Sequence, residues 1–217
     1  DGYGVARAVA LDGSPVLVMI DDVGGFVDYA QSTGIDGSTS GISPANFSIV
    51  QVLPTNANLR QGAVNSGPFV GNVTILEDLG GRAFSGLIEF PGQQILVYTR
   101  GTPYGSAPAG AFTFNGTLAT GLRSLNPQIE YGSFALIANF DNRTFSISGA
   151  TNSDTLNGSG TINTATGTLA ANSLAMNTGG TNRTASLYGN LHGSGAESVS
   201  GMIHSNEASP VYAGTFV

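Results

Sequence analysis

Histidine and serine are the residue types from which this sequence could build a hydrolytic centre, and their arrangement does not favour one. The chain has two histidines, His192 and His204. A hairpin turn near Ser194 to Glu197 would place them far out of register on neighbouring strands. Strand alternation puts both on the face opposite Leu191 and Ile203, so we expect solvated histidines outside the core. No serine lies in a G-x-S-x-G turn, and we therefore predict no enzyme activity.

Metal-binding chemistry has one weak candidate. Asp21, Asp22 and Asp28 form the acidic cluster of the sequence, and their carboxylates with nearby backbone carbonyls could bind Ca²⁺. The EF-hand spacing is missing, and a turn in which the Asp side chains accept bonds from backbone amides explains the segment equally well. The sequence contains no Cys, which excludes disulfides and thiolate zinc sites. We predict no metal centre.

Charge and composition exclude several classes of partner. The 217 residues carry 7 Arg, no Lys and 14 acidic residues, for a net charge of −7. A nucleic-acid backbone or an anionic membrane would be repelled. The longest apolar run, Val16 to Ile20, is too short to span a bilayer. The hydrophobic content of 41% indicates a folded chain, and the Asp at position 1 leads us to expect a mature exported product found outside the cell or on its outer surface.

The residues after position 110 alternate in a way that is typical of a β-barrel. Eight strand-like segments are separated by turns rich in Gly, Asn, Ser and Thr. The segments are Ala111 to Ala119, Gly132 to Asn139, Thr144 to Gly149, Leu156 to Asn163, Gly167 to Ala175, Ala185 to His192, Ser198 to Ser205 and Val211 to Val217. The members of the apolar face predicted to fill the interior include Phe112, Phe114, Phe134, Leu136, Phe145, Leu169, Leu187 and Phe216. We predict an all-β fold with a C-terminal eight-stranded antiparallel up-and-down β-barrel.

The N-terminal half is predicted to be a second β-rich unit. The strand-like segments there are Val16 to Ile20, Phe47 to Leu53, Asn72 to Leu76, Phe84 to Phe90 and Gln94 to Thr99. The Pro- and Gly-rich stretch from Gly101 to Gly110 marks the boundary. We assign 1–103 to an N-terminal handle-like binding unit and 104–217 to the barrel.

The first eleven residues form a strand pattern with one bulky and one small face. Tyr3, Val5, Val9 and Leu11 alternate with Gly and Ala. The segment is interpreted either as an ordinary edge strand of the N-terminal unit or as a strand that pairs with a neighbouring subunit. These four residues are the candidate interaction residues of the second interpretation.

Several segments of the barrel half resemble a known family. They are FNGTLATG at 114–121, YGSFALIANFDNRTFSISG at 131–149, LNGSGTINTATGTL at 156–169, SLYGNLHGSGAESVSGMI at 186–203 and VYAGTF at 211–216. They resemble the β-barrel domain of the transferrin-binding-protein B superfamily, secreted or surface proteins of Gram-negative bacteria that include hemophilin-type haemophores. The sequence departs from the family in having NFD where a more acidic ADF is usual. It also lacks the Cys that anchors some members to lipid.

The resemblance implies an exported, non-enzymatic binding protein with an N-terminal handle, whose ligand could be haem, an iron carrier or a host protein. Hemophilin-like proteins place a haem-ligating His in the N-terminal domain, and residues 1–191 contain none. Tyr can also ligate haem iron, which makes Tyr29, Tyr98 and Tyr104 the candidate ligand-binding residues. Half-buried, hydrogen-bonded Tyr is the alternative interpretation. The alternative function is an extracellular structural subunit that self-assembles by exchange of its N-terminal strand.

Overall fold

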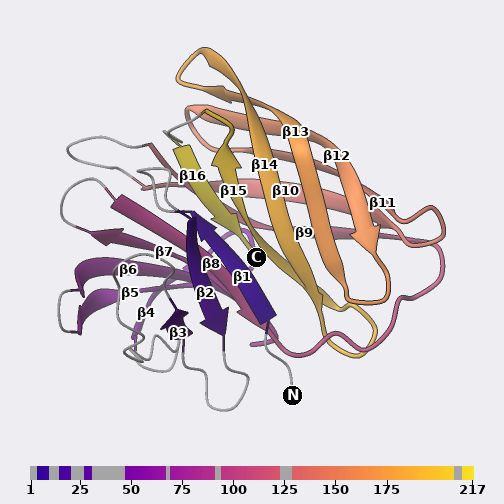
Figure 1. Cartoon of the computed structure of the whole chain (residues 1–217), viewed down its shortest axis with the longest axis horizontal. Coiled ribbons are helices and arrows are strands. Elements are labelled where there is room, and N and C mark those ends of the chain that lie inside the picture. Colours follow the sequence, from indigo (N-terminus) through magenta and orange to yellow (C-terminus); the bar gives the residue numbers. More distant parts are fainter. Residues whose placement is uncertain are drawn as a thin grey trace.

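The computed structural model describes residues 4–9, 15–20, 27–30, 47–66, 69–90, 94–122, 129–207 and 212–217, which form strands and no helix (Figure 1). The N-terminal strands are β1 (Gly4–Val9), β2 (Pro15–Ile20), β3 (Val27–Ala30), β4 (Ile49–Leu53), β5 (Ala57–Ser66), β6 (Phe69–Asp78), β7 (Ala83–Phe90) and β8 (Gln94–Gly101). The C-terminal strands are β9 (Ala111–Leu122), β10 (Ile129–Asn139), β11 (Thr144–Ala150), β12 (Asp154–Asn163), β13 (Thr168–Thr178), β14 (Thr181–His192), β15 (Ser198–Ser205) and β16 (Tyr212–Phe216).

Strands β9 to β16 close into the predicted barrel. Each strand pairs antiparallel with its neighbour in sequence, and β16 returns to pair with β9. The predicted boundaries of Ser198 to Ser205 agree with the structure to the residue, and the other seven differ by a few residues at most. The all-β class and the up-and-down barrel are therefore confirmed.

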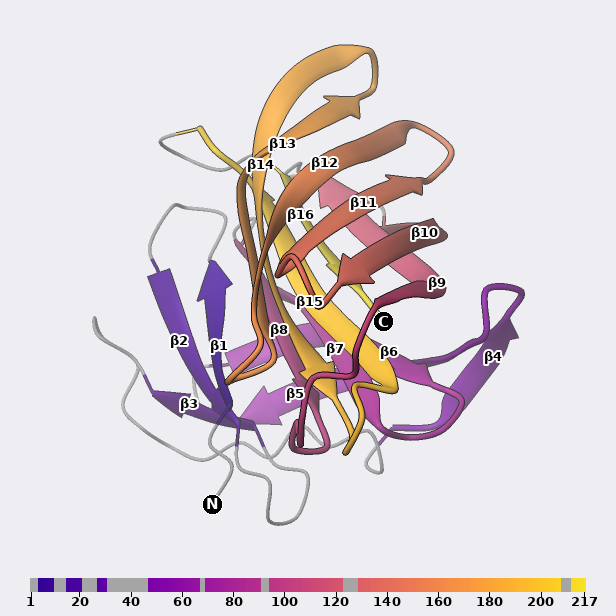
Figure 2. The ribbon, with the colours of Figure 1, turned by 90° about the vertical axis from the view of Figure 1, so that its right-hand side faces the viewer.

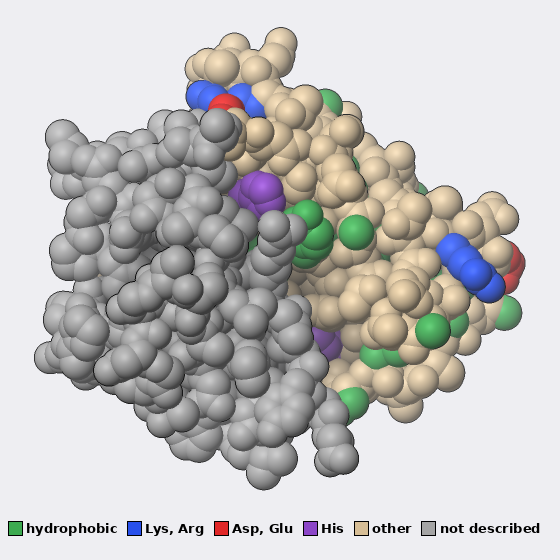
Figure 3. Space-filling view, in the orientation of Figure 1, with side chains coloured by type: hydrophobic (Ala, Val, Ile, Leu, Met, Phe, Trp, Pro, Cys, Tyr) green, Lys and Arg blue, Asp and Glu red, His purple; other side chains and the backbone are tan. Residues whose placement is uncertain are grey.

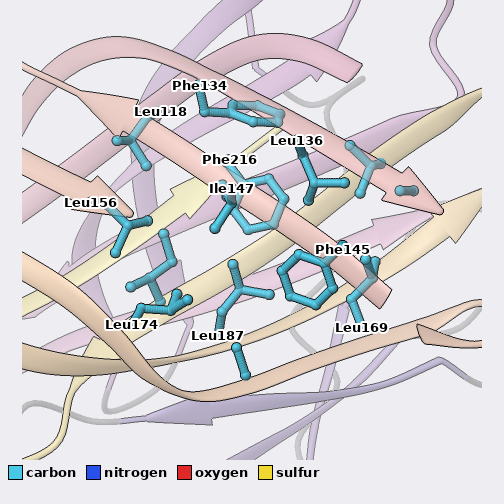
Figure 4. Close-up of a cluster of buried hydrophobic side chains, with 14 of the residues drawn as sticks. Leu118, Phe134, Leu136, Phe145, Ile147, Leu156, Leu169, Leu174, Leu187 and Phe216 are labelled. Atoms are coloured by element: carbon cyan, nitrogen blue, oxygen red, sulfur yellow. The ribbon is translucent and has the colours of Figure 1, made fainter. Parts of the chain in front are cut away.

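The barrel interior is filled by side chains. Phe134 and Phe216 meet edge to face with ring centroids 5.0 Å apart, and Leu136, Phe145 and Leu187 pack around them (Figure 4). Glycine on the inner face makes room for these rings. A Cβ added to Gly201 would lie 2.4 Å from the Phe216 ring. The interior is a packed core, as in other small barrels.

The prediction of the apolar face was wrong at one position and incomplete at two. Phe112 is 44% exposed because it lies near the start of β9, at the end of the barrel, where its ring meets the Phe140 ring edge to face with centroids 5.9 Å apart. Leu174 and Met176 face the interior although simple alternation from Leu169 would turn them outward. A register shift between Ala171 and Leu174 in β13 reverses the alternation there.

The N-terminal half forms two sheets. Strands β4 to β8 form a five-stranded antiparallel sheet in sequence order, and β1 to β3 form a three-stranded one. β3 and β5 were not predicted from the sequence. β5 carries Leu59 and few other large apolar residues, with polar residues and Gly62 through its middle, so its hydrophobic alternation is weak.

The five-stranded sheet packs against the outside of the barrel (Figure 2). Leu59, Ile75 and Leu87 from the sheet share one buried cluster with Met202 and Ala213 from the barrel. Strands β15 and β16 are consequently buried on both faces, whereas exposed and buried residues alternate along β11. The two halves therefore share a core, and this contact fixes the orientation of the sheet on the barrel.

Candidate functional site

The edge of the five-stranded sheet carries an exposed apolar strip on β4. Ile49, Val50 and Val52 are 48%, 53% and 60% exposed, and we call these three residues the edge strip. β4 is the terminal strand of its sheet and, among the described strands, pairs with β5. A terminal strand presents backbone N–H and C=O groups that can pair with another chain. Among the described strands, this edge therefore combines apolar side chains with main-chain groups that have no strand partner.

Both ends of β4 are held by contacts with the rest of the fold. At its start, the Arg60 guanidinium donates to the Phe47 carbonyl at 2.8 Å and to the Glu77 carboxylate at 2.8 Å. The Phe47 ring lies over Gly62, where an added Cβ would be 2.3 Å from it. At its end, Leu53 is buried in the shared core. The strip is thus exposed on a strand whose position is well determined by packing.

A tight turn leads from β4 to β5 and towards the barrel. Pro54 begins the turn, and Asn56 closes it in the left-handed backbone region with φ of 63° and a bond from its amide to the Leu53 carbonyl. The Thr55 hydroxyl bonds to the hydroxyl of Thr117 on β9. This contact holds the turn against the barrel wall.

A groove of about 520 Å³ lies between this turn and the barrel. Its barrel wall includes two rows of paired residues, Asn115–Ala135–Ser148 and Thr117–Ser133–Ala150, running across β9, β10 and β11. Thr117 lies beneath the turn, and the other five are groove-lining residues. All lining residues are uncharged, so the groove can recognise a ligand through hydrogen bonds and close packing, without ion pairs. The groove lining starts at Pro54, the residue directly after β4, so the edge strip and the groove are neighbours along the chain.

A second hollow, of about 370 Å³, lies where the sheet meets the start of β10. The Gln61 side-chain amide crosses it and donates to the Tyr131 hydroxyl at 3.3 Å. This bond links β5 to β10. The hollow lies next to the joint between the sheet and the barrel.

His192 lies at the joint between sheet and barrel, and the expectation that it is solvated was wrong. The ring does face out of the barrel as predicted, but the sheet covers it and leaves it 4% exposed. Its Nδ1–H donates to the Thr102 carbonyl at 3.2 Å, which leaves Nε2 to accept from the Ser200 hydroxyl at 2.7 Å. Burial lowers the pKa of His192 to about 4, against the opposing effects of the Thr102 carbonyl and the Asp78 charge.

The His192–Ser200 pair has the residue types of a nucleophile and its base, but its surroundings are those of a structural network. Ser200 is fully buried, and its hydroxyl also bonds to the Thr99 hydroxyl of β8. Beside this pair, the Ser198 hydroxyl donates to the Asp78 carboxylate at 2.5 Å. These bonds join the barrel to the sheet where no substrate could reach.

His204 also faces out of the barrel, where it is half-buried and stacks on Tyr188 with centroids 6.1 Å apart. It pairs with Ser186 across the hairpin, whereas His192 pairs with Ser198. The prediction that the two histidines are not cross-strand neighbours is confirmed.

Of the three predicted ligand-binding tyrosines, Tyr104 is the one whose side chain the structure describes. It lies in the connection between β8 and β9, half-buried, with its hydroxyl donating to the Thr164 carbonyl at 3.0 Å. Its ring packs against Gly167, and burial raises the pKa of its hydroxyl. The side chains of Tyr29 and Tyr98 lie outside the described residues. The structure therefore places Tyr104 against the barrel and leaves the ligand-binding roles of all three as predictions.

The N-terminal strand pairs within the chain. β1 forms a regular antiparallel ladder with β2, from Gly4 opposite Ile20 to Val9 opposite Pro15. The backbones of Val5 and Val9 lie in this ladder, while Tyr3, Leu11 and the side chains of the acidic cluster lie outside the described residues. The described part of the strand thus has an intramolecular partner.

Within the described ranges, no three His, Asp or Glu side chains gather closely enough to hold a metal ion. The same residues include no helix that could cross a membrane. Where side chains are coloured by type, the barrel surface shows few charged groups among backbone and polar side chains (Figure 3). The uncharged groove is in keeping with this surface.

Comparison with solved structures identifies the fold. The chain aligns over 98% of its length with transferrin binding protein B from serogroup B Neisseria meningitidis, at a TM-score of 0.62 and 13% identity. It aligns over its whole length with intact Ap-TbpB, which has N and C lobes, at 0.60 and 12%. It covers 42% and 46% of those two chains, less than half of each.

A third similar structure is a Phe-171-Ala mutant of transferrin binding protein B from Actinobacillus pleuropneumoniae, at a TM-score of 0.52 and 12% identity. The chain covers 98% of that structure. No protein-family model and no curated protein matches the sequence. The chain therefore has a transferrin-binding-protein-B-like fold, as the alignments and the barrel with its docked sheet show together.

Proposed function

We propose that this protein is an exported, non-enzymatic binding protein of the transferrin-binding-protein B type, and that it recognises a protein partner through the edge strip and the adjoining groove. The single observation that carries the proposal is that an exposed apolar strand and the residues that line an uncharged groove follow one another along the chain. The barrel serves as the scaffold that holds the sheet and forms one wall of the groove.

The packed barrel interior supports recognition on the outside. Phe134, Phe145 and Phe216 fill the space that a ligand-carrying barrel would leave open. The surface features fit a protein partner because protein interfaces combine a desolvated apolar centre with surrounding hydrogen-bonding groups. The edge strip supplies the apolar part, and the Asn and Ser side chains of the groove supply the polar part.

An iron-carrying protein is the ligand class we favour. The similar structures are transferrin binding proteins from two bacteria, Neisseria meningitidis and Actinobacillus pleuropneumoniae, and each is 12% or 13% identical to this chain. Haem is the alternative small ligand and would need an axial residue. The Tyr104 hydroxyl is already bonded to the Thr164 carbonyl, which favours the protein ligand over haem at this residue.

The proposal can be tested by titrating the purified chain with iron-loaded transferrin, ferric citrate and haemin, using biolayer interferometry for the protein and absorption spectra for the small ligands. We expect saturable binding of the protein ligand. Ser148→Arg would place a bulky cation in the groove and should weaken that binding at least tenfold.

Ser159→Arg is the matched control, because Ser159 is also exposed, on the neighbouring strand β12, and does not line the groove. It should bind as the unmodified chain does. Equal weakening by both arginines, or failure of all three ligands to bind, would overturn the proposal.

A further inference from the structure

We propose that β4 binds an extended segment of a protein partner by strand addition, so that the segment becomes a sixth strand of the five-stranded sheet and continues into the groove. This inference deepens the proposed binding role and rests on it. It specifies the chemistry of recognition: main-chain hydrogen bonds along β4, with apolar side chains of the segment against the edge strip.

The two edges of the five-stranded sheet differ in a way that supports this assignment. At one edge, β8 lies against β1 and against β15 of the barrel. At the other, β4 pairs with β5 and carries three side chains about half exposed or more. Edge strands usually carry charged residues, Pro or short lengths that prevent pairing. The sequence Ile-Val-Gln-Val-Leu of β4 contains neither charge nor Pro.

The other exposed large hydrophobic residues of the described chain lack this combination. Leu79 lies in the turn after β6, and Phe112 lies at the barrel end against Phe140. Ile137 is 48% exposed, but its strand β10 is paired on both sides. Within the part of the chain that the structure describes, exposed apolar side chains and a backbone edge without a strand partner therefore coincide at β4.

The length and shape of β4 favour a short segment of another protein over a second copy of this chain. Five residues span about 17 Å, whereas a stable dimer usually buries about 20 to 30 residues on each side. A register shift between Ile49 and Gln51 also interrupts the ladder with β5. Such bulges increase local twist and oppose the pairing of long flat strands. The shift lies at the start of β4, and Gln51 to Leu53 keep a regular register with β5.

The groove gives the segment a place to continue beyond the strip. Pro54 to Asn56 follow β4 directly and form one wall, and Asn115, Ser133 and Ser148 face the groove from the barrel. Their side chains can bond the backbone of a segment after it leaves the sheet. A segment with alternating apolar residues followed by small polar residues fits both parts.

The test uses a fluorescein-labelled nine-residue peptide, Thr-Val-Thr-Val-Thr-Val-Ser-Gly-Ser, measured by fluorescence anisotropy with the full chain. We expect saturable binding and slower amide hydrogen exchange at residues 49–53 in the complex. A peptide N-methylated at alternate residues keeps its side chains but loses main-chain donors, and it should bind at least tenfold more weakly.

Val52→Lys should reduce peptide affinity at least tenfold, while Ile137→Lys, an equally radical change at an exposed strand residue, should leave it unchanged. Circular dichroism of both variants establishes that the fold is retained. Equal affinity of the N-methylated peptide, exchange protection confined to other strands, or concentration-dependent dimers of the chain through β4 would overturn strand addition. If the same preparations still bound transferrin, and Ser148→Arg weakened that binding, the proposed function would stand without strand addition.

Discussion

Acidification should weaken the joint between sheet and barrel because His192 is buried there in its neutral form. Its Nδ1–H is bonded to Thr102, and its Nε2 accepts the Ser200 hydroxyl, which bonds in turn to Thr99. Protonation of Nε2 would remove an acceptor and put a charge into the core between the two halves. The perturbation is therefore a fall in pH that protonates the His192 ring.

The magnitude follows from the two pKa values. The folded-state pKa of about 4 lies below the ordinary value of 6.5, so between these values the unfolded chain binds a proton that the folded chain does not. The contribution of His192 to stability is complete above pH 6.5 and is lost as the pH falls towards 4. With 1.36 kcal/mol for each pKa unit, the loss is about 2 kcal/mol at pH 5 and about 3 kcal/mol at pH 4.

Urea denaturation at pH 7.5, 6, 5 and 4 would measure this loss. The unmodified chain also contains Glu130, Glu197 and Glu207, whose pKa values are lowered in the folded state. Their contributions to the free energy of unfolding are therefore also lost in acid. Subtracting the same measurement on His192→Gln isolates the histidine, because Gln does not titrate. If His192→Gln retained the full slope, the account of this joint would be refuted.

Other predictions concern the core, a glycine and the N-terminal strand. Phe134→Ala should lower the free energy of unfolding by about 3 to 5 kcal/mol, since the ring is buried against Phe216, and a loss below about 1 kcal/mol in urea would contradict its placement. Gly201→Ala should cost about 1 to 3 kcal/mol in thermal unfolding because its Cβ would meet the Phe216 ring; unchanged stability would show that the ring can move aside. Deleting residues 1–11 should destabilise the chain without changing its oligomeric state in light scattering, because β1 pairs with β2 of the same chain. Conversion of an oligomer to a monomer would instead support strand exchange.

The barrel could be predicted from the sequence because each strand carries its own periodic signal. Phe134, Leu136 and Ala138 alternate with less buried residues in β10, and turn residues mark both ends. The alternation breaks in β13, where the register with β14 shifts after Ala171. This shift depends on how the two strands pair, and the amino-acid pattern of β13 alone does not indicate it. Local pattern therefore sufficed for the barrel and failed at its irregularities.

The position of His192 and the edge strip could not be predicted in the same way, because both depend on contacts between distant segments. Alternation placed His192 outside the barrel, but only the docked sheet decides that this outside surface is buried. The strand containing Val50 and Val52 was identified, yet its exposure follows from being last in its sheet. A segment that is apolar on both faces and ends in Pro-Thr-Asn was the available signal, and it is equally typical of a buried strand.

The most direct test of the proposed binding surface is a hydrogen-exchange footprint of the chain in complex with iron-loaded transferrin. The account predicts slower exchange at residues 49–56, 133–135 and 148–150, which form the edge strip, the turn and the groove. Unchanged exchange is expected at 159–162, on the next barrel strand. Protection confined to residues 4–9, or to barrel residues distant from the groove, would contradict the assignment of the surface, and so would an absence of any complex.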